Sequence, residues 1–82
     1  MNQYLIMCRS LTYAQRAARL LERQGISAVV TKAPQGLSQR GCTYALSLRK
    51  NFEEAVRILR KNEMLTGKLY MRSGETYIEV PA

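Results

Sequence analysis

A chain of 82 residues is long enough for one domain around one hydrophobic core, so a second core is excluded. Hydrophobic residues make up 46% and charged residues 23%, which indicates a globular protein and excludes a disordered tail or a fibre. The formal charge of +7 favours polyanions, acidic partners or an anionic surface, without choosing among them. We therefore expect one domain over residues 1–82, with one sheet and one helical layer.

The cysteines Cys8 and Cys42 form no CxxC motif, and the chain has no histidine. This excludes the usual zinc sites and a scaffold held by disulfides, and we expect neither a metal nor another cofactor. The apolar run from Tyr4 to Cys8 is far shorter than the roughly 20 residues of a membrane span, and no basic segment precedes it. We expect a cytoplasmic protein in a reducing environment, without membrane association.

The first predicted elements are a strand and a helix. Residues 3–8 are apolar almost throughout and too few for a stable helix, which predicts a central strand. Ser10 or Thr12 can cap a helix that continues to about Gln24. Its buried stripe at helical spacing consists of Ala14, Ala17, Ala18 and Leu21. Its outer face carries Arg16, Arg19 and Arg23, which we interpret as solvated; contact with an acidic partner or phosphates is the alternative.

Two further strands follow this helix. Gly25 predicts a left-handed end to the helix, and residues 26–31 predict the second strand. Residues 43–49 predict the third strand and alternate more clearly than any other segment. One side carries Tyr44, Leu46 and Leu48, and the other carries Thr43, Ala45 and Ser47.

The C-terminal part predicts a second helix and a hairpin. The helix runs from Phe52 to about Lys61, with Asn51 as its cap and an amphipathic pattern like that of the first helix. Residues 62–67 predict a turn. Residues 68–80 contain two strand-like runs around Ser73-Gly74, which predict a hairpin at the edge of the sheet.

This order of elements predicts an α+β domain with the ferredoxin-like plait, βαββαβ, and an extra C-terminal strand. Right-handed crossovers place strands one and three in the middle of an antiparallel sheet, with both helices on one face. One end of the sheet then collects residues from two distant parts of the chain: Cys8, Arg9, Ser10 and Thr12 with Lys32, Arg40, Gly41 and Cys42. The sequence does not decide which face of strand one is buried.

The longest irregular segment runs from Lys32 to Ala45 and includes Cys42. Cations at Lys32 and Arg40 lie on both sides of the loop that leads to the thiol, and cations or a helix start favour the thiolate. The alternative is a hairpin loop whose cysteine is a small buried apolar residue. A Cys-His hydrolase is excluded because no histidine is present, which leaves sulfur chemistry.

The candidate roles follow from this arrangement. Cys42 is the candidate reactive thiol and Cys8 is its possible resolving thiol. The groups expected to stabilise a thiolate, a persulfide or a bound anion are Arg9, Ser10, Thr12, Lys32, Arg40 and Gly41.

A set of short motifs also carries a resemblance to a known family. They are Thr12 followed by Ala14 at a helix start, Gly25-Ile26, Pro34, Ser38, and Gly41-Cys42 before Ala45. Over roughly residues 4–70 the chain resembles the selenium/sulfur carrier-like family of small bacterial proteins. The resemblance implies that Cys42 holds sulfur or selenium.

Three functions remain open. The first is a sulfur or selenium carrier, or a redox-active thiol, at Cys42. The second is a non-catalytic module that binds a protein partner or a second copy through an uncharged sheet face formed by Leu5, Met7, Thr43, Ala45 and Ser47. The third is nucleic-acid binding, which is less favoured because the chain has no segment of the Lys-Gly-Phe-Gly-Phe type. The sequence thus favours a carrier or a binding module over an enzyme.

Overall fold

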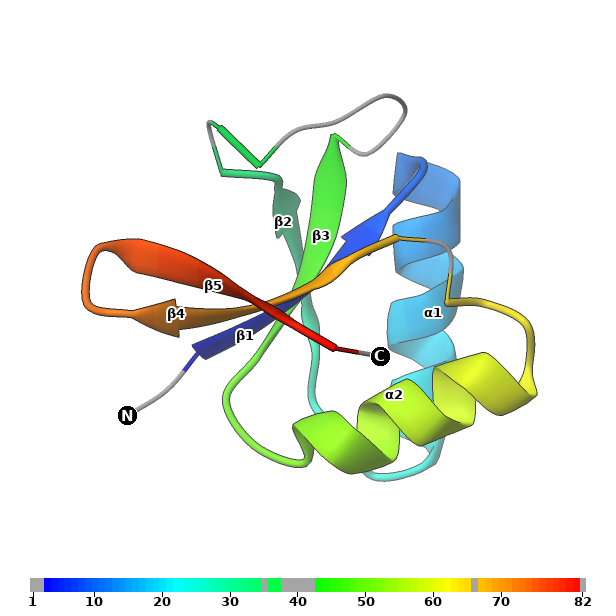
Figure 1. The fold of residues 1–82 in the computed structure, drawn as a ribbon. Helices are drawn as coiled ribbons and strands as arrows, with labels where there is room; N and C mark the ends of the chain where they lie inside the picture. Colours follow the sequence, from blue (N-terminus) through cyan, green and yellow to red (C-terminus); the bar gives the residue numbers. More distant parts are fainter. Residues whose placement is uncertain (1–2, 35, 38–42, 66, 82) are drawn as a thin grey trace.

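The computed structural model describes residues 3–34, 36–37, 43–65 and 67–81 (Figure 1). Its elements are, in chain order, β1 (Gln3–Cys8), α1 (Leu11–Arg23), β2 (Val29–Lys32), β3 (Tyr44–Leu48), α2 (Phe52–Lys61), β4 (Leu69–Ser73) and β5 (Thr76–Val80). The predicted order of strands and helices is confirmed, including the additional terminal strand.

The five strands form one antiparallel sheet in the order β2-β3-β1-β4-β5. Both helices contribute to the core on one face of this sheet, so the α+β class is confirmed. The fit to a ferredoxin-like plait is only loose. A fifth strand extends the sheet beyond β4, and Figure 1 shows α2 lying across one end of α1.

Strand β1 lies at the centre of the sheet and is buried on both faces, which explains its continuous apolar sequence. Ile6 and Cys8 join the core beneath the helices. Leu5 and Met7 belong to a second cluster on the opposite face. The choice that the sequence left open is therefore settled, and Cys8 faces the helices.

Helix α1 packs closely on the sheet because the residues of its inner face are small. Ala14 and Ala17 are fully buried, as is Leu21 one turn further on. Its arginines Arg16, Arg19 and Arg23 are exposed, as predicted. Gly25 follows the helix with φ +82°, the left-handed conformation expected there.

The second strand is shorter than predicted, because Ile26 belongs to the turn that follows α1. The Ile26 amide donates to the Leu21 carbonyl at 2.9 Å, and the Ile26 side chain is buried in the core. This hydrogen bond completes the turn that leaves the helix, so β2 begins only at Val29.

Helix α2 has the predicted bounds, but Asn51 does not cap it through its side chain. The backbone of Asn51 is in the left-handed conformation, with φ 60° and ψ 30°. Its carbonyl oxygen accepts the first hydrogen bond of the helix, from the Ala55 amide. The first helical residue, Phe52, stacks on Tyr4 of β1, with ring centroids 4.4 Å apart. This contact holds the start of α2 against the sheet.

The predicted hairpin is confirmed. Strands β4 and β5 are joined by a two-residue turn in which Gly74 has φ +62°, a conformation that glycine adopts without strain. Strand β4 pairs with β1, and β5 forms the edge of the sheet. Figure 1 shows this hairpin extending away from the two helices.

Candidate functional site

The end of β1 brings Cys8 into a row that crosses three strands. Cys8 pairs with Tyr44 of β3, and Tyr44 pairs with Lys32 of β2. Side chains that lie directly opposite each other on antiparallel strands share a face of the sheet. The side chains of Cys8, Tyr44 and Lys32 therefore all lie on the face that carries the helices, with Tyr44 between the other two.

Cys8 is buried, with 2% of its surface exposed. Its Sγ atom donates to the Ile6 carbonyl at 3.5 Å, and it packs in the core cluster that includes Ala14 of α1. Tyr44, on the neighbouring strand, is only partly buried and closes the same region at the surface. Access to the Cys8 thiol is therefore restricted by the residues around it.

The start of α1 lies directly after Cys8 and Arg9. The Ser10 hydroxyl accepts a hydrogen bond from the Tyr13 amide at 3.1 Å, and Ser10 is thus the helix cap. Thr12 is exposed in the first turn, which holds no acidic residue. The Arg9 guanidinium lies 5.7 Å from the centre of the Tyr13 ring, an aromatic partner that we did not predict.

Ser10→Ala is expected to lower the free energy of unfolding by about 1 kcal/mol, because the Tyr13 amide loses its acceptor. Urea denaturation followed by circular dichroism measures this loss. Ser10→Asp, which keeps an acceptor at the cap, is the matched control and should retain most of the stability. Equal losses in the two variants would contradict the capping role.

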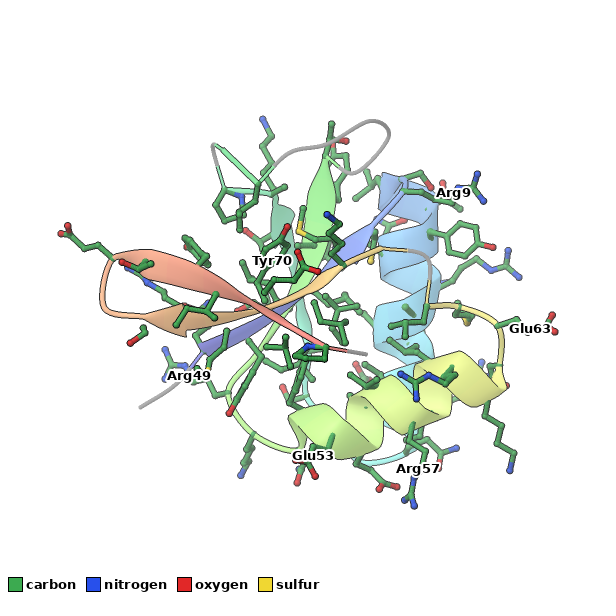
Figure 2. All side chains as sticks on the ribbon, in the orientation of Figure 1. Arg9, Arg49, Glu53, Arg57, Glu63 and Tyr70 are labelled. Carbon is green, nitrogen blue, oxygen red and sulfur yellow. The ribbon has the colours of Figure 1, made fainter. Side chains whose placement is uncertain are left out.

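The electrostatic setting of this end is basic. The described segments 7–14, 31–34 and 43–45 contain Arg9 and Lys32 and no carboxylate. Among the described residues, ion pairs join Arg57 to Glu54 and Lys68 to Glu79, and neither includes an arginine of α1. Figure 2 shows Arg9 at the start of α1, at the opposite end of the molecule from Glu53. An anionic group at this end would meet positive charge.

The remaining predicted site residues, Arg40, Gly41 and Cys42, lie outside the described residues, as does Ser38. The structure places Cys8, Arg9, Ser10, Thr12 and Lys32 at the same end of the sheet, and the positions of the other three stay predictions. The segment that contains them is closed at its base, where the Ala33 amide donates to the Thr43 carbonyl at 2.9 Å.

The opposite face of the sheet is less open than we predicted, although Thr43 is exposed and Ser47 is half-buried. Leu5, Met7 and Ala45 are buried, in a cluster with Tyr70. Partly buried side chains from the loop and from β5 also cover this cluster: Ala33, Leu37 and Tyr77. The sequence did not reveal this cover, because it comes from segments that are distant along the chain. Figure 2 shows Tyr70 over the middle of the sheet.

The described residues contain no cluster of three or more His, Cys, Asp or Glu side chains that could bind a metal ion. Within the same part of the chain, neither helix has the length and apolar character needed to cross a bilayer.

Comparison with known proteins gives one match. A family model described as "Putative Se/S carrier protein-like" matches residues 3–71, from the first residue of β1 into β4. No curated protein and no solved structure matches the chain. The matched region includes both cysteines and the whole of the end described above.

Proposed function

Because this chain belongs to the Se/S carrier-like family, we propose that it carries sulfur or selenium on Cys42, which alternates between a thiol and a persulfide or its selenium counterpart. The observation that carries the proposal is the pairing of Cys8 with Tyr44. Tyr44 follows Cys42 by only two residues, a stretch of chain that spans at most about 7 Å, and this short link supports pairing the two thiols in one mechanism.

Loading is a transfer between thiols. The Cys42 thiolate attacks the outer sulfur of a donor persulfide, the donor's S–S bond breaks, and the donor leaves as a thiolate. Cys42 then holds the transferred sulfur as a persulfide. No metal or organic cofactor takes part, and no net oxidation occurs, so the step suits a reducing cytoplasm.

The basic end of the sheet supports this chemistry. Cations close to a thiol lower its pKa and favour the thiolate, which is the attacking species. Lys32 lies in the row with Cys8 and Tyr44, Arg9 lies next to Cys8 in the chain, and Arg40 precedes Cys42 by two residues. The first turn of α1, capped by Ser10 and free of acidic residues, adds the positive end of a helix dipole.

Cys8 takes the role of the resolving thiol. Its thiolate attacks the Cys42 sulfur of the persulfide, a Cys8–Cys42 disulfide forms, and the carried atom leaves as hydrosulfide. A cellular dithiol then reduces the disulfide and restores both thiols. Because Cys8 is 2% exposed, thiols in solution have little access to it.

The fold that we propose for this carrier is a ferredoxin-like plait with one additional edge strand. Strands β1 to β4 stand in the order β2-β3-β1-β4, and β5 extends the sheet beyond β4. Nucleic-acid binding has less support, because Leu5, Met7 and Ala45 of the two inner strands are buried and present no stacking surface. The basic face of α1 then serves to attract an acidic donor or acceptor protein.

The intact mass of gently purified protein tests the carrier function. Wild-type protein exposed to glutathione persulfide should first gain the mass of one sulfur atom, and attack by Cys8 should then replace this gain with the loss of two hydrogens as hydrosulfide leaves and the disulfide forms. Cys42→Ser should gain nothing, whereas Cys8→Ala should still be loaded. Cys8→Ala protein without the added atom, or an equal gain in Cys42→Ser, would disprove the proposal.

A further inference from the structure

Strand β5 is an edge strand with weak protection against pairing, because its one charged residue, Glu79, is in an ion pair with Lys68. Edge strands of soluble proteins commonly carry lysine, proline or a bulge that prevents another strand from adding to them. Residues Thr76–Val80 contain no lysine, proline or glycine, and all five pair in regular register with β4. The other edge strand, β2, is shorter and ends at Lys32. The backbone of β5 is therefore open to another strand.

The central residue of β5 is apolar and exposed. Ile78 keeps 47% of its surface accessible, and it lies opposite Met71 of β4. Both side chains line a groove of about 980 Å³ between this hairpin and α2. The floor of the groove includes the stacked rings of Tyr4 and Phe52. This groove exists because α2 lies across the end of α1 and does not extend over β5 (Figure 1).

The groove also differs from the rest of the molecule in charge. Its lining contains three cations and three carboxylates: Arg49, Lys50, Arg60, Glu53, Glu54 and Glu79. Half of the six glutamates of a +7 chain are thus gathered around one surface. Two copies of this chain repel each other in most orientations, and a balanced surface is where that repulsion is smallest. At the β2 edge, by contrast, residues 26–34 carry Lys32 and no carboxylate.

We propose that β5 pairs with β5 of a second copy of this chain, in antiparallel orientation, about a twofold axis at Ile78. Because Ile78 is the middle of five residues, this register uses the whole strand. Ile78 then faces its own copy, Tyr77 faces Glu79, and Thr76 faces Val80. The result is a continuous ten-stranded sheet.

The hairpin geometry agrees with this register. The two-residue turn ends at the pair Ser73–Thr76, and hydrogen bonding alternates along an antiparallel ladder. The amides and carbonyls of Tyr77 and Glu79 therefore point away from β4, as pairing with a second β5 requires. Ile78 becomes a pair without mutual hydrogen bonds, whose Cα atoms lie about 4.5 Å apart. The apolar side of the groove adds contact area to a strand too short to form a stable interface alone.

Sedimentation velocity on the full chain, at concentrations on the order of 10 to 500 µM, measures the association. We expect a dimer whose dissociation constant rises at least about tenfold in Ile78→Lys. The matched control is Val29→Lys, because Val29 is 62% exposed on the other edge strand and should leave the dimer unchanged. A monomer throughout the range, or dissociation by Val29→Lys alone, would overturn the proposal.

Cysteine cross-linking tests the register in a Cys42→Ser background. Ile78→Cys should form a disulfide-linked dimer under mild oxidation, because the two residues face each other as a pair without mutual hydrogen bonds. Val29→Cys in the same background should stay monomeric. Similar cross-linking of both variants indicates random collision, and a dimer in which Ile78→Cys does not cross-link excludes the proposed register. Either result overturns the proposal.

Discussion

Gly67→Ala is expected to lower the free energy of unfolding by roughly 1–3 kcal/mol or more, because a Cβ atom there meets rigid backbone. That atom would lie 2.5 Å from the Met7 carbonyl oxygen and 2.9 Å from the Met7 carbonyl carbon. The Met7 amide also donates to the Lys68 carbonyl at 3.0 Å, so any shift of the chain at Gly67 weakens the junction of β1 and β4. Thermal and urea denaturation measure the effect.

The control for this prediction is Gly74→Ala. A Cβ atom at Gly74 meets nothing within 4 Å, so this variant creates no steric clash. Because φ is +62°, the free energy of unfolding should fall only by the cost of a left-handed alanine, about 1 kcal/mol. If Gly67→Ala is no more destabilising than Gly74→Ala, the close approach of Gly67 to Met7 is not essential. Because Met7 precedes Cys8, Gly67→Ala is also expected to loosen the end of the sheet that carries the proposed chemistry.

Cys8→Ala is expected to separate loading from release. Cys42 should still accept sulfur from glutathione persulfide, but release of hydrosulfide should slow by at least about tenfold, because the neighbouring resolving thiol is lost. Loading is followed by intact mass, and release by a colorimetric assay for sulfide under anaerobic conditions.

Two further measurements make this result interpretable. Circular dichroism establishes that Cys8→Ala is folded, since Cys8 packs in the main core. Gly74→Ala serves as a control with a small loss of stability at the turn between β4 and β5, away from the proposed site, and it should release sulfide at nearly the wild-type rate. Unchanged release in Cys8→Ala would show that an external thiol resolves the persulfide, and the carrier role of Cys42 would then stand without Cys8.

Local patterns were sufficient for most of the secondary structure. The alternation of residues 43–49 predicted the two faces of β3, because a strand turns successive side chains to opposite sides. The alanine stripe predicted the buried face of α1 for the equivalent reason at helical spacing. The bounds of α2 and the hairpin at Gly74 were also predicted, because a helical repeat and turn residues mark them within a few positions.

The errors have a common cause. Ile26 has the composition of a strand residue, but a hydrogen bond to Leu21 keeps it in the turn that follows α1. Asn51 has the composition of a cap, but its left-handed backbone provides no side-chain cap. Leu5 and Met7 lie on a face that we expected to be open, yet Tyr70 and Leu37 cover it. In each case a contact or backbone conformation decided between structures that the residue types allow equally well.

By itself, the sequence determined the strand-helix-strand order, the buried stripes, the basic charge and the family to which the chain belongs, because each is recorded in neighbouring residues or in short motifs. Only the tertiary structure decided that Cys8 faces the helices, that it lies in one row with Tyr44 and Lys32, and that β5 is left as an open edge with Ile78 exposed. The reason is physical. Pairing register and burial depend on which distant segments meet, and a single residue on β1 is compatible with either face until the strands and helices around it are in place.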